Sequence, residues 1–383
     1  MGRFLNPGRQ MFQRALNSEI YVDKSGIIGR LNRLVETEQC HVCVSRPRRF
    51  GKTMTGNMLV SYYGQGADSR SQFEGLAIAD DPTFEQHLNQ YDVIQLNIRD
   101  FVSEASSTEE MVAFITEDVV KELKRAYPEA MPRRLGSLPN VLAEAYAFTG
   151  RTFVFVIDEW DAVFRVHQSD AAAQTTYLDW LRNLLKDKPY VALTYMTGIL
   201  PIKKYGEHSA LNMFTEISMV DAWPFDEYTG FTEGEVVALC ERYGRSIDEM
   251  RRWYDGYTVG GEAIYNPRSA VMSTMSGRYN NYWTQTENFE ALRVYVDMDM
   301  DGLHEKVVRL VAGERLPVDT TAFVNDMTTF ASADDVLTLL VHLGYLTYDA
   351  EERTVRVPNL EVMQQFGTVL RDSGWAEVAR DRK

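Results

Sequence analysis

A run of five consecutive apolar residues, Phe153 to Ile157, constrains the fold of this chain more than any other feature. A strand without apolar–polar alternation is buried on both faces, as in a parallel sheet covered by helices. Similar short β-prone runs occur at His41–Ser45, Val93–Ile98 and Tyr190–Thr197, and helical patterns separate them. This alternation predicts a doubly wound α/β domain over roughly residues 20–220.

The apolar residues between these runs recur at spacings of three and four, which indicates helices packed by one face. Beyond residue 220 the pattern becomes mainly helical, and Thr232 to Glu235 has the form of a capping box. A helix from about Asp334 to Leu343, stopped by Gly344, precedes two runs that can pair as a hairpin. This outline predicts a winged helix-turn-helix. The expected parts are an α/β domain at 1–220, a helical lid or linker at 221–300 and a winged-helix-like domain at 301–383.

Composition narrows the class of protein. The 383 residues are enough for two or three packed units, and 45% hydrophobic with 25% charged residues is typical of a globular protein. The chain contains no apolar run of about 18 residues, so we expect no membrane span. Three cysteines and an N-terminus without a secretory signal favour the cytoplasm. The net charge of -15 favours a protein partner or self-association, and makes DNA a secondary hypothesis.

The segment after His41–Ser45 predicts a phosphate-binding loop followed by a helix from Lys52 to about Tyr63. Backbone N–H groups of such a loop point at the phosphates, and the helix N-terminus favours negative charge. Lys52 is expected to reach the β- and γ-phosphates, and the Thr53 hydroxyl to hold Mg²⁺. The loop departs from the usual G-x-x-x-x-G-K-[ST] pattern at its first position. The nucleotide-binding residues predicted here are Arg46, Pro47, Arg48, Arg49, Phe50, Gly51, Lys52 and Thr53.

Two adjacent carboxylates end the apolar run at Phe153–Ile157. Nucleotide hydrolysis needs one carboxylate for Mg²⁺ and another to orient the attacking water, so we assign Asp158 to the first role and Glu159 to the second. Asp161 is a third, outer-shell acid or simply a helix N-cap. Thr197 ends the next β-prone run and is expected beside Asp158, where its hydroxyl senses the γ-phosphate or its water. A buried, satisfied threonine is an equally good interpretation.

Other motifs have ordinary explanations. Cys40 and Cys43 have C-x-x-C spacing but lie on a β-prone run, and Cys240 alone remains, so core packing explains them better than zinc. The loop arginines fit phosphate neutralisation, yet an arginine can equally pair with an acid across an interface. Neither an H-E-x-x-H nor a G-x-S-x-G motif is present.

The chain resembles the predicted AAA-ATPase-like proteins of bacteria, which belong to the P-loop ATPases related to the STAND and origin-recognition types. The resemblance implies an ASCE-type α/β core, a helical region, a winged-helix-like C-terminal part, and ATP as the nucleotide. It also implies that Arg46, which replaces the first glycine of the usual pattern, is a variation typical of the family. It further implies that Tyr21–Lys24 packs against the nucleotide region. The matching segments are Tyr21–Ser25, Ser45–Thr53, Ile157–Asp161, Thr197–Ile199, Ser209–Phe214, Trp253–Tyr257, Tyr265–Pro267 and Pro358–Val362.

Many members of that family carry a further C-terminal domain resembling a restriction-type nuclease. Since this sequence stops soon after Val362, at Arg380–Lys383, we do not carry a nuclease function over. Two functions follow. The first is a molecular switch that hydrolyses ATP with Mg²⁺ and thereby changes how its helical and winged-helix parts dock. The second is a nucleotide-gated interaction module without useful hydrolysis, which contacts DNA or a protein. An arginine finger is not identified, and Arg182 is one of several candidates.

Overall fold

The computed structural model describes residues 2–130, 136–202, 211–283, 289–298, 300–324 and 327–372. The chain divides into two compact units. The first comprises Met1–Ser45 and Lys52–Ile217, and the second comprises Arg46–Gly51 and Ser218–Lys383. Ser209 and Ala210 of one family-like segment, residues 131–135 of the expected link and the terminal Arg380–Lys383 lie outside the described residues.

A five-stranded parallel sheet forms the centre of the first unit, in the order β2-β3-β4-β1-β5. Every residue of β1, β3 and β4 is buried, which confirms the expectation of a sheet covered on both faces. The predicted strands agree with the observed ones to within a residue at each end. The strands are β1 His41–Ser45, β2 Asp92–Asn97, β3 Phe153–Asp158, β4 Val191–Gly198 and β5 Thr215–Ile217.

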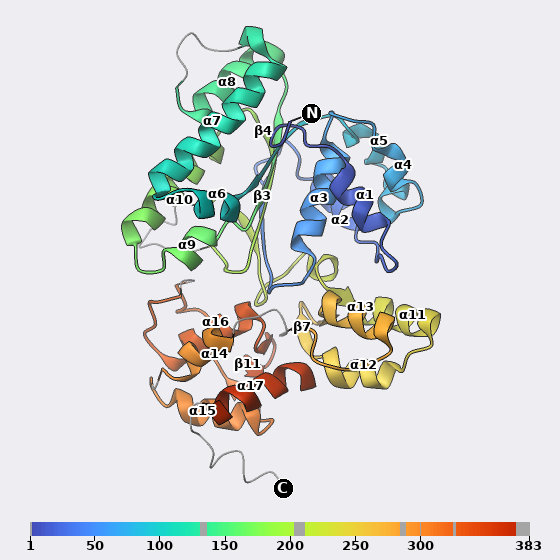
Figure 1. Ribbon diagram of the computed structural model, residues 1–383, viewed down its shortest axis with the longest axis vertical. Coiled ribbons are helices and arrows are strands. Elements are labelled where there is room, and N and C mark those ends of the chain that lie inside the picture. Colours follow the sequence, from blue (N-terminus) through green and yellow to red (C-terminus); the bar gives the residue numbers. More distant parts are fainter. Residues whose placement is uncertain are drawn as a thin grey trace. The chain divides into compact units, whose positions relative to one another are not determined.

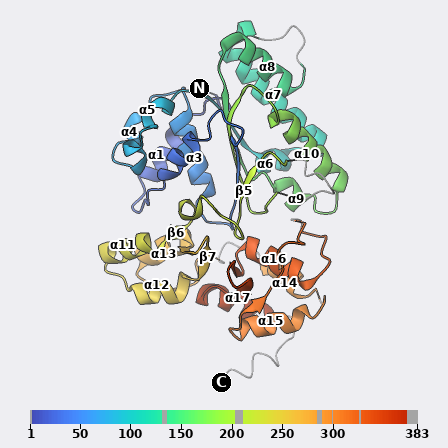
Figure 2. The same cartoon turned by 180° about the vertical axis from the view of Figure 1, so that it is seen from behind.

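Helices cover the two faces of this sheet. Figure 1 shows α1 to α5 on one face and α6 to α10 on the other, and the view from behind in Figure 2 shows the same division. The predicted doubly wound α/β fold is therefore confirmed. The helices are α1 Gln10–Leu16, α2 Gly26–Asn32, α3 Lys52–Tyr63, α4 Arg70–Phe73, α5 Phe84–His87, α6 Ile98–Glu104, α7 Thr108–Ala126, α8 Leu138–Thr149, α9 Ala162–Val166 and α10 Ala171–Leu185, with 3-10 turns at Ala77–Asp80 and Pro128–Ala130.

Helix α3 lies close against the strand that ends in the two carboxylates. A Cβ atom added at Gly56 would lie 3.2 Å from Val156 Cγ1, so the glycine permits a close approach of α3 to β3. The first residue of α3 is Lys52, directly after Gly51, whose φ of 86° ends the preceding loop. The start of α3 is thereby fixed near the carboxyl end of β3.

The second unit contains two small antiparallel sheets and seven helices in its described part. The capping box at Thr232 is confirmed, and α16 ends at Gly344 in the left-handed conformation. The predicted hairpin is confirmed as β10 and β11, and β9 joins it. The winged-helix assignment and the division at residues 220 and 300 stay predictions. The elements are β6 Phe231–Thr232, β7 Tyr257–Val259, β8 Glu262–Tyr265, β9 Leu316–Pro317, β10 Thr347–Asp349, β11 Thr354–Arg356, α11 Glu233–Tyr243, α12 Ile247–Tyr254, α13 Pro267–Ser276, α14 Phe289–Val296, α15 Leu303–Val311, α16 Ala333–Leu343 and α17 Leu360–Asp372, with a 3-10 turn at Asp226–Tyr228.

Two expectations based on composition can be compared with the coordinates. Within the described ranges, no helix is long and apolar enough to cross a membrane. Cys40, Cys43 and Cys240 are free and buried, which confirms that they pack in the protein core. Burial raises the pKa of each of these thiols.

Candidate functional site

The carboxylate of Asp158 is the meeting point of three elements of the first unit. Its Oδ2 accepts a hydrogen bond of 2.6 Å from Thr53 Oγ1, and its Oδ1 accepts one of 2.5 Å from Thr197 Oγ1. The carboxylate is buried, with 7% of Asp158 exposed. These contacts follow from the topology, because β4 lies beside β3 in the sheet and α3 begins just after β1. The structure thus brings together three residues that the sequence singled out.

The carboxylates of Asp158, Asp161 and Glu159 interact electrostatically with the ammonium group of Lys52. Burial lowers the pKa of its ammonium group to about 8, and Asp158 followed by Asp161 partly oppose that shift. Desolvation disfavours the charged form of a lysine, so a nearby anion is needed to keep it fully protonated. A polyphosphate is an anion of this kind, and its charge would raise the pKa of Lys52 again.

Glu159 follows β3 in a left-handed backbone conformation, with φ of 51°. Its side chain is 34% exposed and forms an ion pair of 2.6 Å through Oε2 with Arg165 Nη2. Arg99 Nη1 lies 4.0 Å from the same oxygen. The carboxylate assigned to the attacking water is therefore held in one orientation by a nearly buried guanidinium.

Arg165 was missed by sequence reasoning, although a signal for it exists. Its Nε lies 3.1 Å from Asp161 Oδ2, and the two residues are four apart at the start of α9, the spacing of a helical ion pair. Arg165 therefore bridges Asp161 and Glu159. A check for oppositely charged residues at that spacing would have found the first of these two contacts.

Asp161 is the N-cap residue of α9, as one of its two interpretations predicted, but its side chain has a different role. It occupies the N-cap position of α9 but makes no side-chain cap bond. Its fully buried Oδ2 instead accepts hydrogen bonds from the backbone N–H groups of Ile199, at 3.1 Å, and Leu200, at 3.0 Å. Asp161 thereby ties the segment after β3 to the end of β4.

Gly198 makes room for the residue between the two acids. An added Cβ would lie 2.6 Å from Trp160 Cδ1 and 2.9 Å from Asp161 Oδ1, both of which belong to fully buried side chains. The missing side chain therefore allows the indole of Trp160 to pack against the end of β4.

We predict that Gly198→Ala destabilises the protein by about 1–3 kcal/mol, the usual cost of overpacking a rigid core. The matched control is Gly234→Ala in α11, where an added Cβ meets nothing within 4 Å. That control should be neutral or stabilising by up to about 1 kcal/mol, since alanine favours helix. Urea unfolding of both variants measures the difference, and equal stability of the two would contradict this account of Gly198.

The remaining residues of the predicted phosphate loop differ in exposure. Arg46, Pro47 and Phe50 are buried, whereas Arg48 and Arg49 are exposed. The Arg46 guanidinium donates a hydrogen bond of 2.6 Å from Nη1 to the Ser218 carbonyl within the second unit. The side chain of Arg46 thus contacts protein. Contact with protein was the alternative to phosphate neutralisation for the loop arginines, although the partner here is a carbonyl group and not an acid. Any phosphate contact from Arg46 or Phe50 would therefore come from its backbone N–H group, whereas Pro47 has no N–H to donate.

Two other expectations concern more distant residues. In the Tyr21–Lys24 segment, Asp23 Oδ2 accepts a hydrogen bond of 2.6 Å from Ala77 N, and the Tyr21 ring lies 6.1 Å from that of Phe12. These contacts fix the segment to its own neighbours, and its role toward a nucleotide stays a prediction. Arg182 is exposed on α10 and stays one candidate for an arginine finger.

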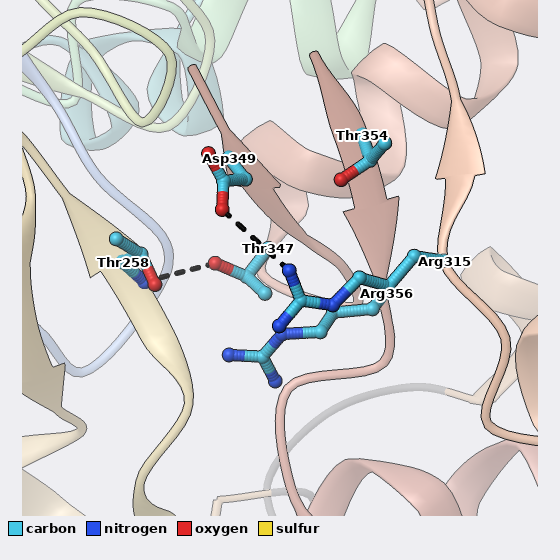
Figure 3. A pocket seen from close by; sticks show the side chains of 6 residues that line it. All are labelled: Thr258, Arg315, Thr347, Asp349, Thr354 and Arg356. Atoms are coloured by element: carbon cyan, nitrogen blue, oxygen red, sulfur yellow. Dashed lines mark hydrogen bonds and ion pairs between the residues drawn. The ribbon is translucent and has the colours of Figure 1, made fainter. Parts of the chain in front are cut away.

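A small polar pocket lies within the second unit, between β7 and the β10–β11 hairpin (Figure 3). Its volume is about 60 Å³. Arg315 pairs with Glu352 at 2.9 Å, and Arg356 donates to the Gly256 carbonyl at 3.0 Å. Since both guanidinium groups have partners in the protein, the pocket is best explained as a polar junction. The lining residues are Thr258, Arg315, Thr347, Asp349, Thr354 and Arg356.

The fold now defines a class of protein. In the parallel sheet, β4 separates the strand before the loop, β1, from the strand that ends in two acids, β3. This order, with a Lys-Thr pair opening the helix after the loop, is that of ASCE-type P-loop ATPases. The description "Predicted AAA-ATPase" matches residues 8–206, just over half of the 383 residues. The chain belongs to the family of predicted AAA-ATPases.

One curated relative and several solved structures are similar to the chain. The "Uncharacterized protein in vnfD 5'region" of Azotobacter chroococcum mcd 1 is 28% identical over 369 residues, which cover 91% of this chain and 66% of the relative. The chain thus spans just under two thirds of that relative. A structure of the Aeropyrum pernix ORC2 protein is 11% identical, with a TM-score of 0.39, and covers 96% of this chain and 99% of that one. For CDC6P from Pyrobaculum aerophilum the identity is 11%, the TM-score 0.34, and the coverage 97% and 99%.

Proposed function

We propose that this protein binds ATP with Mg²⁺ at Lys52, Thr53 and Asp158, hydrolyses it with the help of Glu159, and acts as a nucleotide-dependent switch in the cytoplasm. The observation that carries the proposal is the 2.6 Å contact between Thr53 Oγ1 and Asp158 Oδ2. A hydroxyl and a carboxylate from distant parts of the sequence meet at the start of the helix that follows the loop. These are the oxygen ligands that Mg²⁺ uses in nucleotide sites.

The donor set fits a metal that is held only partly by protein. Among the described residues, no group of three or more His, Cys, Asp and Glu forms a metal cluster. Mg²⁺ in phosphate-transfer sites needs no such cluster, since one or two protein oxygens, phosphates and water complete its octahedron. When bound, Mg²⁺ would neutralise charge that develops on the phosphates. Thr53 and Asp158 are the residues that would hold it.

The other side chains of the site also have tasks in the proposed reaction. Lys52 binds the β- and γ-phosphates, and their negative charge keeps its ammonium protonated. Glu159 orients the attacking water and accepts its proton, with Arg165 fixing the carboxylate at 2.6 Å. Thr197, hydrogen-bonded to Asp158, orients that carboxylate and senses the γ-phosphate side of the site. In-line attack by an oriented water is how P-loop enzymes cleave the terminal phosphate.

A second candidate function is supported by the ion pair at Glu159. A carboxylate engaged by a buried arginine is less available to a water molecule, as expected of a protein that binds ATP without useful hydrolysis. Such a protein would be a nucleotide-gated module for a protein or DNA partner. The net charge of -15 favours a protein partner or self-association over DNA.

The experiment that tests the main proposal is phosphate release from ATP by the purified chain, with Mg²⁺ and with a chelator. We expect slow turnover that requires Mg²⁺, and Asp158→Asn should raise the Mg²⁺ concentration at half-maximal rate roughly tenfold or more, since one anionic ligand is lost. Asp179→Asn, on the exposed surface of α10, is the matched control. Turnover that persists in chelator would contradict the metal site, and ATP binding without turnover would favour the second candidate.

A further inference from the structure

The backbone of the predicted phosphate loop is held by side chains from the C-terminal half of the sequence. The carbonyl of Arg48 accepts hydrogen bonds from Trp283 Nε1, at 3.3 Å, and from Asn266 Nδ2, at 3.5 Å. Loop and donors belong to the same compact unit. Because phosphate loops bind through their backbone N–H groups, whatever fixes the orientation of one loop peptide helps to fix the binding site.

The two donors are themselves fixed in place. Asn266 Oδ1 caps helix α13 by accepting from the N–H groups of Arg268 and Ser269, at 3.0 and 3.2 Å, which leaves its amide group directed at the loop. The backbone N–H of Trp283 donates to Glu361 Oε1 at 2.8 Å. This bond fixes the backbone of Trp283 beside a buried carboxylate, and the indole packs against the ring of Tyr345, with ring centroids 5.4 Å apart.

Glu361 joins three parts of the second unit. Only 2% of this residue is exposed, and it lies at the start of α17. Its Oε1 also accepts from Tyr282 N at 2.6 Å, and its Oε2 accepts from Ser269 Oγ at 2.8 Å. Burial raises the pKa of Glu361, and the hydrogen bonds from Trp283, Tyr282 and Ser269 oppose that shift. Through this one carboxylate, α17 is hydrogen-bonded both to α13 and to the segment that contains Trp283.

Phe50 and Pro47 provide a second set of loop contacts. The Phe50 ring packs edge-on against Tyr257, with ring centroids 5.5 Å apart, and its carbonyl accepts from Gly230 N at 3.3 Å. Tyr257 Oη in turn donates to the Gly344 carbonyl at 2.7 Å. A Cβ at Gly344 would lie 2.8 Å from Pro47 Cβ, so this glycine allows the loop to pack closely.

We propose that Asn266 and Trp283 are positioning residues for the phosphate loop, and that Glu361 links the conformation of the loop to helices α13 and α17 of the same unit. This inference rests on the proposed ATP site. It assigns a task to Asn266 and Glu361, residues of two family-like segments that ATP hydrolysis itself leaves unexplained. Coupling between two sites is reciprocal. A nucleotide that stabilises this conformation of the loop therefore also stabilises the hydrogen bonds from Asn266 and Trp283 to Arg48.

Simple packing is the competing explanation, and the two explanations predict different binding data. If Trp283 only fills space, then Trp283→Phe lowers the fraction of folded, competent protein while the Kd of the folded sites stays the same. If the indole N–H positions the loop, the stoichiometry stays the same and the Kd rises. Loss of one neutral hydrogen bond predicts an increase of about 3- to 10-fold.

The first measurement needs no nucleotide. We expect Trp283→Phe to speed amide hydrogen exchange of the peptide that contains residues 46–51, because the loop loses one of the donors to Arg48. Trp253→Phe is the matched control, since that indole lies on α12 and packs against Tyr254, with ring centroids 6.2 Å apart. Equal loop exchange in the two variants would overturn the inference.

The second measurement is titration of the full chain with MgATP. In Trp283→Phe we expect a Kd about 3- to 10-fold higher at full stoichiometry, and in Trp253→Phe the parent value. Asn266→Asp is a second variant, because an aspartate preserves the helix cap but loses the donor to Arg48. Parent-like affinity in both loop variants would overturn the inference and leave the ATP site intact. If the parent chain itself binds no ATP, the proposed function fails and the coupling falls with it.

Discussion

Lys52→Ala is expected to weaken ATP binding by roughly 100-fold or more, because truncating one member of a buried, hydrogen-bonded charge pair costs about 2–5 kcal/mol. The ammonium group stands among Asp158, Asp161 and Glu159, and burial already lowers its pKa to about 8. A bound polyphosphate would add further negative charge beside the ammonium group and raise its pKa again. Isothermal titration with ATP measures the loss of affinity. Lys121→Ala, at an exposed position of α7, is the control.

The same lysine predicts a pH dependence with a definite sign. In the nucleotide-free protein Lys52 is protonated below its pKa of about 8 and neutral above it. Phosphates favour the charged form, so binding above pH 8 must take up a proton, and the affinity falls as the pH rises. Lys52→Ala should lack this fall. An unchanged affinity in the variant, with the same pH profile as the parent, would exclude Lys52 from the phosphate site.

The strands and helices of the first unit were predictable because their signals are local. Apolar runs such as Phe153–Ile157 show burial on both faces, and spacings of three and four indicate helices. β5 was not predicted. It has only three residues, Thr215–Ile217, of which just one is buried, and it joins the sheet through pairing with β1. Short edge strands are defined by their partners more than by their own sequence.

The candidate site shows the same division between local and long-range information. That Thr53, Asp158 and Thr197 lie together was predictable because each follows or ends an element at one edge of a parallel sheet. The hydrogen bonds from Asn266 and Trp283 to Arg48 were not, since they span 218 and 235 residues. No periodicity or spacing in the sequence reports a contact at that distance.

Glu159→Gln is expected to lower ATP turnover by about 100- to 10,000-fold, the usual contribution of a positioned general base. ATP affinity should change little, because the proposed ligands of the nucleotide are Lys52, Thr53 and Asp158. The amide keeps the size of the side chain, and its oxygen can still accept from Arg165, which holds the carboxylate at 2.6 Å in the parent. The substitution therefore removes charge and basicity and preserves the shape of the site.

Single-turnover phosphate release, with ATP binding measured on the same samples, distinguishes the two proposed functions. Glu117→Gln, exposed on α7, is the matched control and should turn over ATP like the parent. Full turnover in Glu159→Gln would show that another group handles the water. If parent and variant both bind ATP and neither hydrolyses it, the ion pair with Arg165 holds Glu159 out of reaction, and the protein is a nucleotide-gated module. A hydrolytic switch requires that the parent and Glu117→Gln turn over ATP and that Glu159→Gln does not.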